Sequence, residues 1–350
     1  MLDLTEMRAT LAETYDLAPS ITLAEEMRDI HARMDRVVPL PDFARYAPYI
    51  REINRLKREK NAVILAHNYM TPEIYHGVAD VVGDSLQLAI EATRVEAETI
   101  VQCGVHFMAE TSKILNPAKR VLIPDMAAGC SLAESITAEG IAQMRAKYPG
   151  APVVSYVNTT AEVKAASDIC CTSSNAAQIV AAMDSDTVIM TPDQYLAQNV
   201  ARDVPQKNVV WWAGACIVHE QYTPADINDF RALHPGVQII AHPECPPNVV
   251  EACDFSGSTS GIIKYVADRK PKQAMLVTEC SMASNIADAL PEVEFMGPCN
   301  MCPYMKKITL EKILWSLHTG REEVIVDLAV AEKARVAVER MIDLSKKLGL

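Results

Sequence analysis

The stretch "DINDFRALHPGVQIIAHPE" (226–244) contains the pattern that decides the fold. Its first half spaces apolar residues as an amphipathic helix does, and an apolar strand-like run follows the Pro-Gly turn. The same order occurs twice more, in "EINRLKREKNAVILAHNY" (52–69) and "GIAQMRAKYPGAPVVSYVN" (140–158). Each copy therefore predicts a helix, a turn and a buried strand with polar residues at its carboxyl end.

The correspondence continues beyond these stretches, because an Asp, a hydroxyl residue five positions later and a Cys recur in each copy. The three cysteines are 86 residues apart from one to the next. Unrelated α/β units would share strand patterns by chance, but not these matched polar positions, so we infer a threefold duplication. The recurring residues are Asp80, Asp168 and Asp254; Ser85, Ser173 and Thr259; and Cys130, Cys216 and Cys302.

Short apolar strands that alternate with helical patterns are typical of parallel sheets covered by helices. We therefore expect an α/β fold with three units, each a small four-stranded parallel sheet with helices on both faces. Ligands of such sheets bind outside the carboxyl ends of the strands, so the active site is expected at the common centre of the units. The expected boundaries are an N-terminal helical extension (1–45), three α/β repeats (46–138, 139–224 and 225–318) and a C-terminal helical segment (319–350).

The composition excludes several classes of function. The net charge of −12 and the pI near 5.2 argue against a nucleic-acid-binding or anionic membrane surface. No apolar run approaches the roughly 20 residues of a membrane span, and the charged N-terminus lacks the apolar core of a signal peptide. We expect a cytoplasmic protein, in which ten cysteines favour metal or redox chemistry over a disulfide framework.

The three repeated cysteines predict a metal centre with one open position. Three thiolates around a [4Fe–4S] cluster would leave one iron available to substrate as a Lewis acid. On spacing alone, zinc held by three Cys and a water is the alternative. Cys299 forms a Cys-x-x-Cys pair with Cys302, which is moderately specific for metal or redox chemistry. Cys299 is therefore a candidate redox residue that would compete for iron or form a disulfide with Cys302.

Proton-transfer groups recur at the strand ends, where the candidates are His67, Tyr69, His242, Glu244 and, three residues after Cys216, His219. A single His at a strand end is more often merely hydrogen-bonded, but recurrence in the repeats favours function. The candidate hydroxyls precede helical patterns and would serve as N-caps or as phosphate and carboxylate ligands. They are Ser85, Ser173, Ser258 and Thr259. Nucleotide-binding glycine motifs are absent from the sequence.

Six ordered motifs together resemble the quinolinate synthase A family of bacterial NAD (pyridine nucleotide) biosynthesis. They span roughly residues 50 to 315 and read "LAHNY", "GDSLQLA", "PVVSYVNTTAEVKAASDICCTSSNA", "HPEC", "GST" and "CPYMKKITLEKIL". The resemblance implies a pseudo-threefold arrangement of three domains and a central [4Fe–4S] cluster. Its implied ligands are Cys130, Cys216 and Cys302.

The resemblance also implies a reaction, the condensation of iminoaspartate with dihydroxyacetone phosphate to quinolinate with loss of phosphate and water. Tyr69 and Glu244 would be the acid–base pair, assisted by His67 and His242, which bind and orient substrate. The implied substrate-binding residues are Tyr156, Asn158, Ser85, Ser173, Ser258 and Thr259, with His219 near the cluster. An aspartate oxidase or dehydrogenase is the implied partner, because iminoaspartate must be supplied. The rival interpretations are a cluster-binding regulator without turnover and a zinc-dependent aldolase or lyase.

Overall fold

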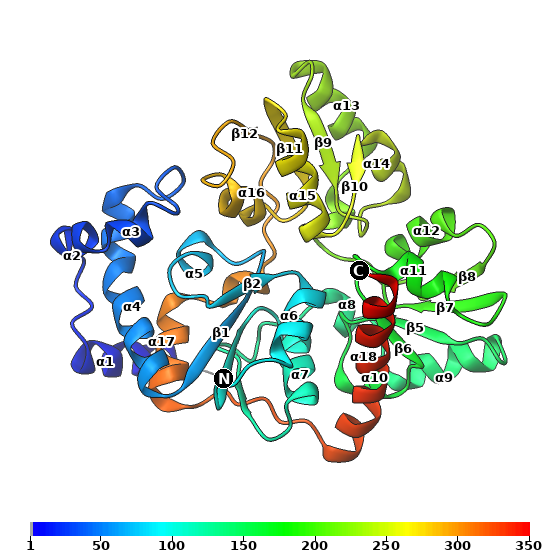
Figure 1. Cartoon of the computed structure of the whole chain (residues 1–350), viewed down its shortest axis with the longest axis horizontal. Helices are drawn as coiled ribbons and strands as arrows, with labels where there is room; N and C mark the ends of the chain where they lie inside the picture. The colour runs from blue at the N-terminus through cyan, green and yellow to red at the C-terminus, as the bar shows by residue number, and fades with distance from the viewer. Residues whose placement is uncertain (1–2) are drawn as a thin grey trace. The chain divides into compact units, whose positions relative to one another are not determined.

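The computed structural model describes residues 3–350, and within them twelve strands form three four-stranded sheets (Figure 1). The first sheet has the order β2-β1-β3-β4, the second β6-β5-β7-β8 and the third β10-β9-β11-β12. Because the chain visits the four places of each sheet in the same sequence, the topology repeats three times. This repetition supports the duplication inferred from the sequence.

The strands are short, and their bounds follow in chain order. In the first sheet they are β1 (Ala62–His67), β2 (Val81–Gly83), β3 (Thr99–Cys103) and β4 (Arg120–Leu122). In the second they are β5 (Val153–Tyr156), β6 (Ile169–Cys171), β7 (Thr187–Thr191) and β8 (Asn208–Trp211). In the third they are β9 (Gln238–Ala241), β10 (Phe255–Ser256), β11 (Gln273–Val277) and β12 (Glu294–Phe295).

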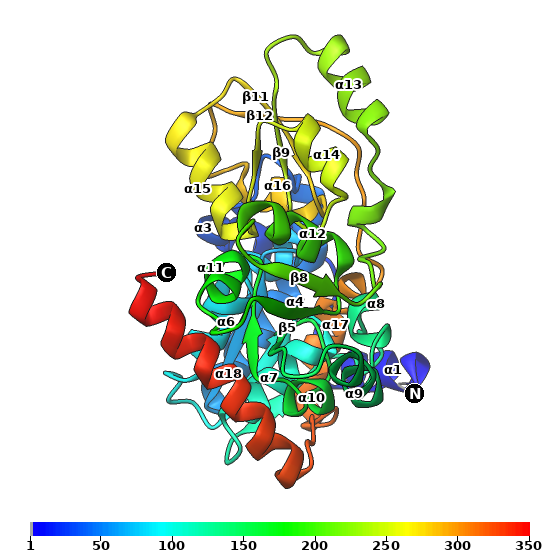
Figure 2. The ribbon, with the colours of Figure 1, turned by 90° about the vertical axis from the view of Figure 1, so that its right-hand side faces the viewer.

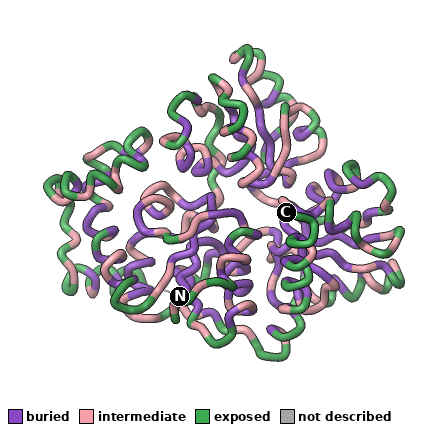
Figure 3. Tube along the Cα trace, in the orientation of Figure 1, coloured by how far each residue is buried: buried purple, intermediate pink, exposed green. Residues whose placement is uncertain are grey.

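Parallel pairing is found in all three sheets, as between β1 and β2, β5 and β6, and β9 and β10. The first strand of each repeat is central in its sheet and nearly continuously buried, as Figure 3 shows in purple. Uninterrupted apolar runs suit this position, because helices cover both faces of a parallel sheet. The predicted α/β fold with three four-stranded parallel sheets is confirmed.

A partly exposed ion pair between a basic side chain and the recurring Asp is found in each repeat, and the same Asp also binds a backbone N–H of the central strand. In the first, Lys57 Nζ lies 2.7 Å from Asp80 Oδ1, and Asp80 Oδ2 accepts a 2.8 Å hydrogen bond from the backbone N–H of Ile64. The second and third sheets carry the same contacts with Arg145, Asp168 and Val153, and with Arg231, Asp254 and Ile239. The recurring Asp therefore fixes the start of a central strand, which explains its spacing without a catalytic role.

The helices surround the sheets, and amphipathic spacing places their apolar sides against the strands. Those before and around the first sheet are α1 (Leu4–Thr14), α2 (Ile21–Glu26), α3 (Arg28–His31), α4 (Leu40–Glu59), α5 (Pro72–Tyr75), α6 (Ser85–Ala92) and α7 (His106–Leu115). Those from there to the end of the second repeat are α8 (Ser131–Glu134), α9 (Ala138–Lys147), α10 (Ala161–Ala165), α11 (Ala176–Ala181), α12 (Gln194–Asp203) and the 3-10 helix η1 (His219–Gln221). The remaining ones are α13 (Pro224–Leu233), α14 (Pro247–Ala252), α15 (Thr259–Arg269), α16 (Ser281–Ile286), η2 (Met305–Lys307), α17 (Leu310–Thr319) and α18 (Leu328–Leu348).

The chain forms two compact units. The first contains the residues up to Ala128 together with Cys280–Glu294 and Met301–Val324, and the second contains Gly129–Glu279, Phe295–Asn300 and Ile325–Leu350. In the first unit, α17 packs on α4. In the second, the long C-terminal helix α18 lies along α10 and β6, as the two views in Figures 1 and 2 show in red. The boundaries predicted from the repeats, and a common centre for them, stay predictions.

Across residues 3–350, no helix combines the length and the apolar character that crossing a membrane requires.

Candidate active site

Glu244 is a buried carboxylate of the second unit with several polar partners. It follows β9 by three residues, and its side chain is almost fully buried, at 4% exposure. The hydroxyl of Tyr156, the last residue of β5, donates a 2.6 Å hydrogen bond to Glu244 Oε1. The amide of Asn158 lies 3.5 Å from the same oxygen. The ends of two central strands thus converge on one carboxylate, as expected for the carboxyl edges of parallel sheets.

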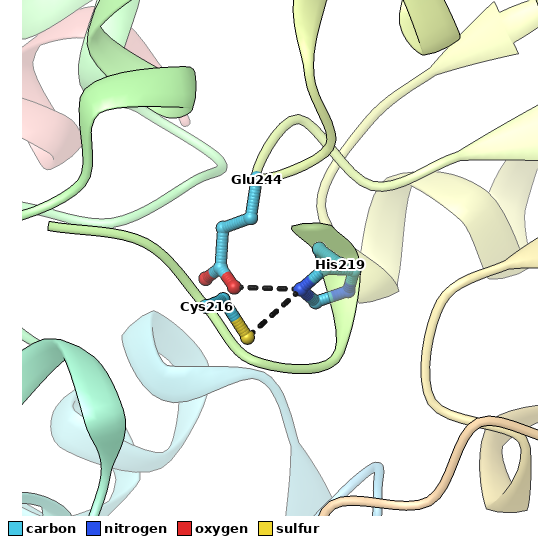
Figure 4. A group of neighbouring side chains, drawn as sticks. All are labelled: Cys216, His219 and Glu244. Carbon is cyan, nitrogen blue, oxygen red and sulfur yellow. Dashed lines mark hydrogen bonds and ion pairs between the residues drawn. The ribbon is translucent and has the colours of Figure 1, made fainter. Parts of the chain in front are cut away.

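His219 joins this carboxylate to a cysteine. Its Nδ1 lies 2.8 Å from Glu244 Oε2 and 3.2 Å from Cys216 Sγ, and Figure 4 shows the three side chains pointing toward one another. Its Nε2 lies 2.9 Å from Thr278 Oγ1. Because a carboxylate only accepts hydrogen bonds, Nδ1 of His219 carries a proton and donates a hydrogen bond to Glu244. The ring is therefore fixed at both nitrogens.

His242 completes the basic surroundings of Glu244. Its ring stacks on that of His219, with centroids 4.7 Å apart, and its Nδ1 accepts a 3.3 Å hydrogen bond from the backbone N–H of Glu244. Burial by itself raises the pKa of Glu244, but the charges of His242 and His219 and the hydrogen bonds from His219 and Tyr156 outweigh it. The net result is a pKa of Glu244 well below its usual value. Glu244 is thus held as a carboxylate.

Two of the three repeated cysteines lie in this unit. Cys130 and Cys216 are half-buried thiols. Ser131 bridges their segments, because its hydroxyl donates to the carbonyl of Ala215 at 3.1 Å and accepts from the N–H of Ile217 at 3.2 Å. Burial, then the charges of Glu244 and Cys130, raise the pKa of Cys216, while backbone N–H groups of the following turn favour its thiolate. A bound metal cation would offset the negative charges of Glu244 and Cys130 and so stabilise the thiolate of Cys216.

The first unit contains Tyr69, the predicted acid–base partner of Glu244, together with His67. His67 ends β1, and its Nδ1 accepts a 3.2 Å hydrogen bond from the backbone N–H of Tyr69, whose ring packs edge-on against the imidazole at 4.7 Å. The same turn occurs at His242 and Glu244 in the second unit, so the two loops are structural equivalents. Cys302, a half-buried thiol, begins a turn in which its carbonyl accepts from the N–H of Lys306 at 3.1 Å.

The candidate hydroxyls differ in their local roles. Ser258 caps α15 by accepting from the N–H of Gly261 at 3.2 Å, and Thr259 is the first residue of that helix. Ser85 does not cap α6, because Asp84 does, and Ser173 precedes Asn175, the N-cap residue of α11. The capping interpretation is therefore wrong for these two serines. Ser173 and Ser258 line one cleft of about 600 Å³ in the second unit.

The remaining cysteines divide by burial and by redox state. Cys103, Cys170, Cys171 and Cys245 are buried thiols; burial is the default expected of apolar cysteines in strand-like runs, such as the first three. Cys253 is half-buried rather than buried, and Cys280 and Cys299 are each disulfide-bonded, which was not predicted. Because Cys302 is a thiol, the disulfide hypothesised between Cys299 and Cys302 is not formed.

Sequence reasoning missed two supporting residues, Thr278 and Ser131. Thr278 follows β11 and holds His219, and a Thr also ends the equivalent strand β7 at Thr191. That repetition was the available signal. No comparable signal marks Ser131, since its role depends on the backbone path around Cys216.

Comparisons with known proteins identify the family of this chain. The family model described as Quinolinate synthetase A protein matches residues 51–343. A quinolinate synthase of Sinorhizobium fredii is 57% identical over 339 residues, which cover 97% of this chain and 94% of the relative. One of Caulobacter vibrioides is 59% identical over 302 residues, 85% of this chain and 82% of the relative, and one of Xylella fastidiosa is 58% identical over 293 residues, 84% and 86%. The chain therefore belongs to the quinolinate synthetase A family.

Proposed function

We propose that this chain is a condensing enzyme of NAD biosynthesis, of transferase or lyase type, which joins iminoaspartate to dihydroxyacetone phosphate. The products are quinolinate, one phosphate and two molecules of water, so that atoms balance without an oxidant. The observation that carries the proposal is the buried group of Glu244, Tyr156 and His219 beside Cys216, in a chain of this family. It combines a proton acceptor, hydroxyl and imidazole donors and a metal ligand.

Proton transfer is the part of the reaction that Glu244 suits. Forming the ring requires a proton to leave a carbon next to a carbonyl or imine, and hydroxyl groups must be protonated as they depart. Glu244 is buried, and His242 and His219 stabilise its charge, so it stands in the carboxylate form that can accept a proton. Tyr69 and its partner His67 would supply the complementary donor from the first unit.

We assign substrate binding to one buried amide and to four hydroxyl residues. Asn158 Oδ1 is buried and finds no hydrogen-bond partner within the described chain, so it suits an N–H or O–H of the substrate. Ser258 and Thr259 stand at the start of α15, an 11-residue helix whose N-terminus favours phosphate or carboxylate. Ser173 lines the same cleft as Ser258, while Ser85 would act from the first unit. These contacts suit two anionic substrates.

The donor chemistry fits a [4Fe–4S] cluster held by Cys130, Cys216 and Cys302. All three are half-buried thiols rather than disulfides, and N–H groups of the turn after Cys216 point to its sulfur, as is common around cluster sulfurs. When bound, the cluster would supply one Lewis-acidic iron that polarises an oxygen of the substrate. His219 would keep the Cys216 segment and Glu244 in fixed relation.

A second candidate, a zinc-dependent lyase, is favoured by one observation. Ligand atoms of Cys216, His219 and Glu244 all lie within 4.8 Å of one another, which is a plausible zinc set. The cluster proposal leaves Glu244 for proton transfer, whereas zinc would use it as a ligand. Iron, sulfide and zinc analysis of the purified protein separates the two.

The proposed activity is tested by supplying anaerobically purified protein with dihydroxyacetone phosphate and freshly generated iminoaspartate, and measuring quinolinate by chromatography. An aspartate oxidase or dehydrogenase added to the assay generates iminoaspartate and tests the proposed partner. We expect quinolinate and phosphate in equal amounts. Iron-loaded protein that makes neither product would refute the proposal.

A further inference from the structure

Two buried asparagines make the same contact with the two candidate acid–base loops. In the second unit, Asn199 Nδ2 donates to the carbonyls of Pro243 and Cys245, at 2.9 and 3.0 Å, which stand on either side of Glu244. In the first unit, Asn285 Nδ2 donates to the carbonyls of Asn68 and Met70, at 2.9 and 2.7 Å, on either side of Tyr69. Both asparagines are 3% exposed.

The two asparagines are equivalent positions of the repeat. They are 86 residues apart, the spacing of the repeated cysteines, and each stands six residues after a buried acid, Asp193 or Glu279. Neither Asn199 Oδ1 nor Asn285 Oδ1 has a hydrogen-bond partner in the described part of the chain. Burying an amide oxygen without a hydrogen-bond partner costs free energy. The role of both asparagines is therefore in the Nδ2 group, which makes the two hydrogen bonds.

This contact fixes the residue between the two carbonyls without touching its side chain. When the carbonyls of residues i−1 and i+1 meet one donor, the backbone torsions of residue i are constrained, and with them the direction of its Cα–Cβ bond. The direction of that bond determines which positions the Glu244 carboxylate and the Tyr69 hydroxyl can reach. A displacement of about 1 Å is enough to cost on the order of 100-fold in rate.

We propose that Asn199 and Asn285 are positioning residues, which hold the loops of Glu244 and Tyr69 through their flanking carbonyls. We call this pair of hydrogen bonds to the flanking carbonyls a clamp. Its effect on catalysis rests on the proposed function, whereas its effect on the loop backbone does not. No contact of either amide with a reacting group is required.

The two loops differ in how much other support they have. The Tyr69 carbonyl also accepts from Lys306 Nζ at 2.8 Å, and the N–H of Asn68 donates to the carbonyl of Gly83 at 3.1 Å. The Glu244 loop has its histidine turn and the N–H of His242, which donates to the carbonyl of Val277 at 3.2 Å, but neither bond reaches the backbone carbonyl of Glu244. Loss of Asn199 should therefore matter more than loss of Asn285.

The experiment compares Asn199→Ala and Asn285→Ala with Asn116→Ala in the full-length, iron-loaded protein. Asn116 is a matched control, because its buried Nδ2 also donates to two carbonyls, those of Ala92 and Ser112 at 3.0 and 3.1 Å. We expect kcat to fall about 100-fold in Asn199→Ala and about tenfold in Asn285→Ala, with KM and iron content changed far less. Asn199→Asp keeps the shape but replaces the donor, so it should lose as much as the alanine variant.

Hydrogen exchange followed by mass spectrometry provides a readout that does not depend on the reaction. Asn199→Ala should speed exchange only in residues 242–246, Asn285→Ala only in 67–71, and Asn116→Ala in neither. Wild-type kcat and unchanged exchange in both clamp variants would overturn the inference, as would an equal loss of kcat in Asn116→Ala. If wild-type protein makes no quinolinate, the proposed function fails, and the exchange pattern still decides the clamp.

Discussion

The hydroxyl of Tyr156 donates a 2.6 Å hydrogen bond to Oε1 of Glu244, and so joins the end of β5 to the loop after β9. The two residues are 88 positions apart and come from neighbouring repeats. Short hydrogen bonds to a carboxylate are among the stronger ones in proteins, because one partner is charged. The contact shows how duplicated units build one site: each contributes a strand end, and the polar residues complete one another.

Glu244→Gln should retain the fold and the bound iron but lose most turnover. The amide has nearly the same shape as the carboxylate but cannot act as a base, and loss of a general base typically costs about 100-fold or more. Quinolinate formation and iron content are measured on the same sample. Glu139→Gln, an exposed change in α9, is the control and should behave as wild type. Full activity of Glu244→Gln would remove this residue from the mechanism.

Tyr156→Phe should lower kcat by about tenfold and lower the free energy of unfolding by about 1–3 kcal/mol. It deletes one charge-assisted hydrogen bond to Glu244, worth about 1.5–3 kcal/mol, while Asn158 and His219 still hold the carboxylate. Tyr265→Phe also removes a hydroxyl hydrogen bond, of 3.0 Å to Gln238, away from the site, and should have no effect on kcat. Equal activity of both variants would argue against a role for the Tyr156 hydroxyl.

Asp168→Ala should destabilise the protein by about 1–3 kcal/mol, because it leaves the N–H of buried Val153 without its acceptor. The ion pair with Arg145 adds little, since both side chains are about two-fifths exposed. Urea unfolding followed by circular dichroism measures the change. Asp268→Ala removes a fully surface-exposed pair with Lys264 and should shift stability by less than about 0.5 kcal/mol. A similar small shift in Asp168→Ala would contradict the structural role given to the recurring Asp.

Cys253 should react slowly with iodoacetamide at pH 8 even though it is half-buried rather than buried. Burial raises the pKa of Cys253 to about 12, and it does the same for Cys170. Only the thiolate is nucleophilic, so the rate should rise about tenfold per pH unit below that pKa. Mass spectrometry of native and urea-unfolded protein gives both rates. Native labelling of Cys253 as fast as in the unfolded chain at pH 8 would contradict this environment.

The sequence was sufficient for the fold because its signals are local. Apolar runs such as "VILAH" predict a buried strand directly, and the recurrence of Asp254 in the other copies indicated the repeat, although its contact with the strand backbone was found only in the structure. The polar ends of β1, β5 and β9 could likewise be found, because parallel topology puts them at one kind of edge.

Side-chain partnerships across loops could not be derived in this way. The position of His219 between Cys216 and Glu244 depends on the path of η1. Asp84 and not Ser85 caps α6, because the helix begins at Ser85. Asn199 and Asn285 show a partial exception. Their 86-residue spacing can be found in the sequence, but the sequence does not indicate that their amides donate to carbonyls beside Glu244 and Tyr69.

The central claim, that three repeated cysteines hold a catalytic [4Fe–4S] cluster, is tested most directly by counting metal. Protein purified without oxygen should contain about four iron and four sulfide per chain. Cys216→Ala should lose them together with quinolinate formation, whereas Cys253→Ala should keep both. Colourless wild-type protein with stoichiometric zinc, or a Cys216→Ala variant that retains full iron, would contradict the claim.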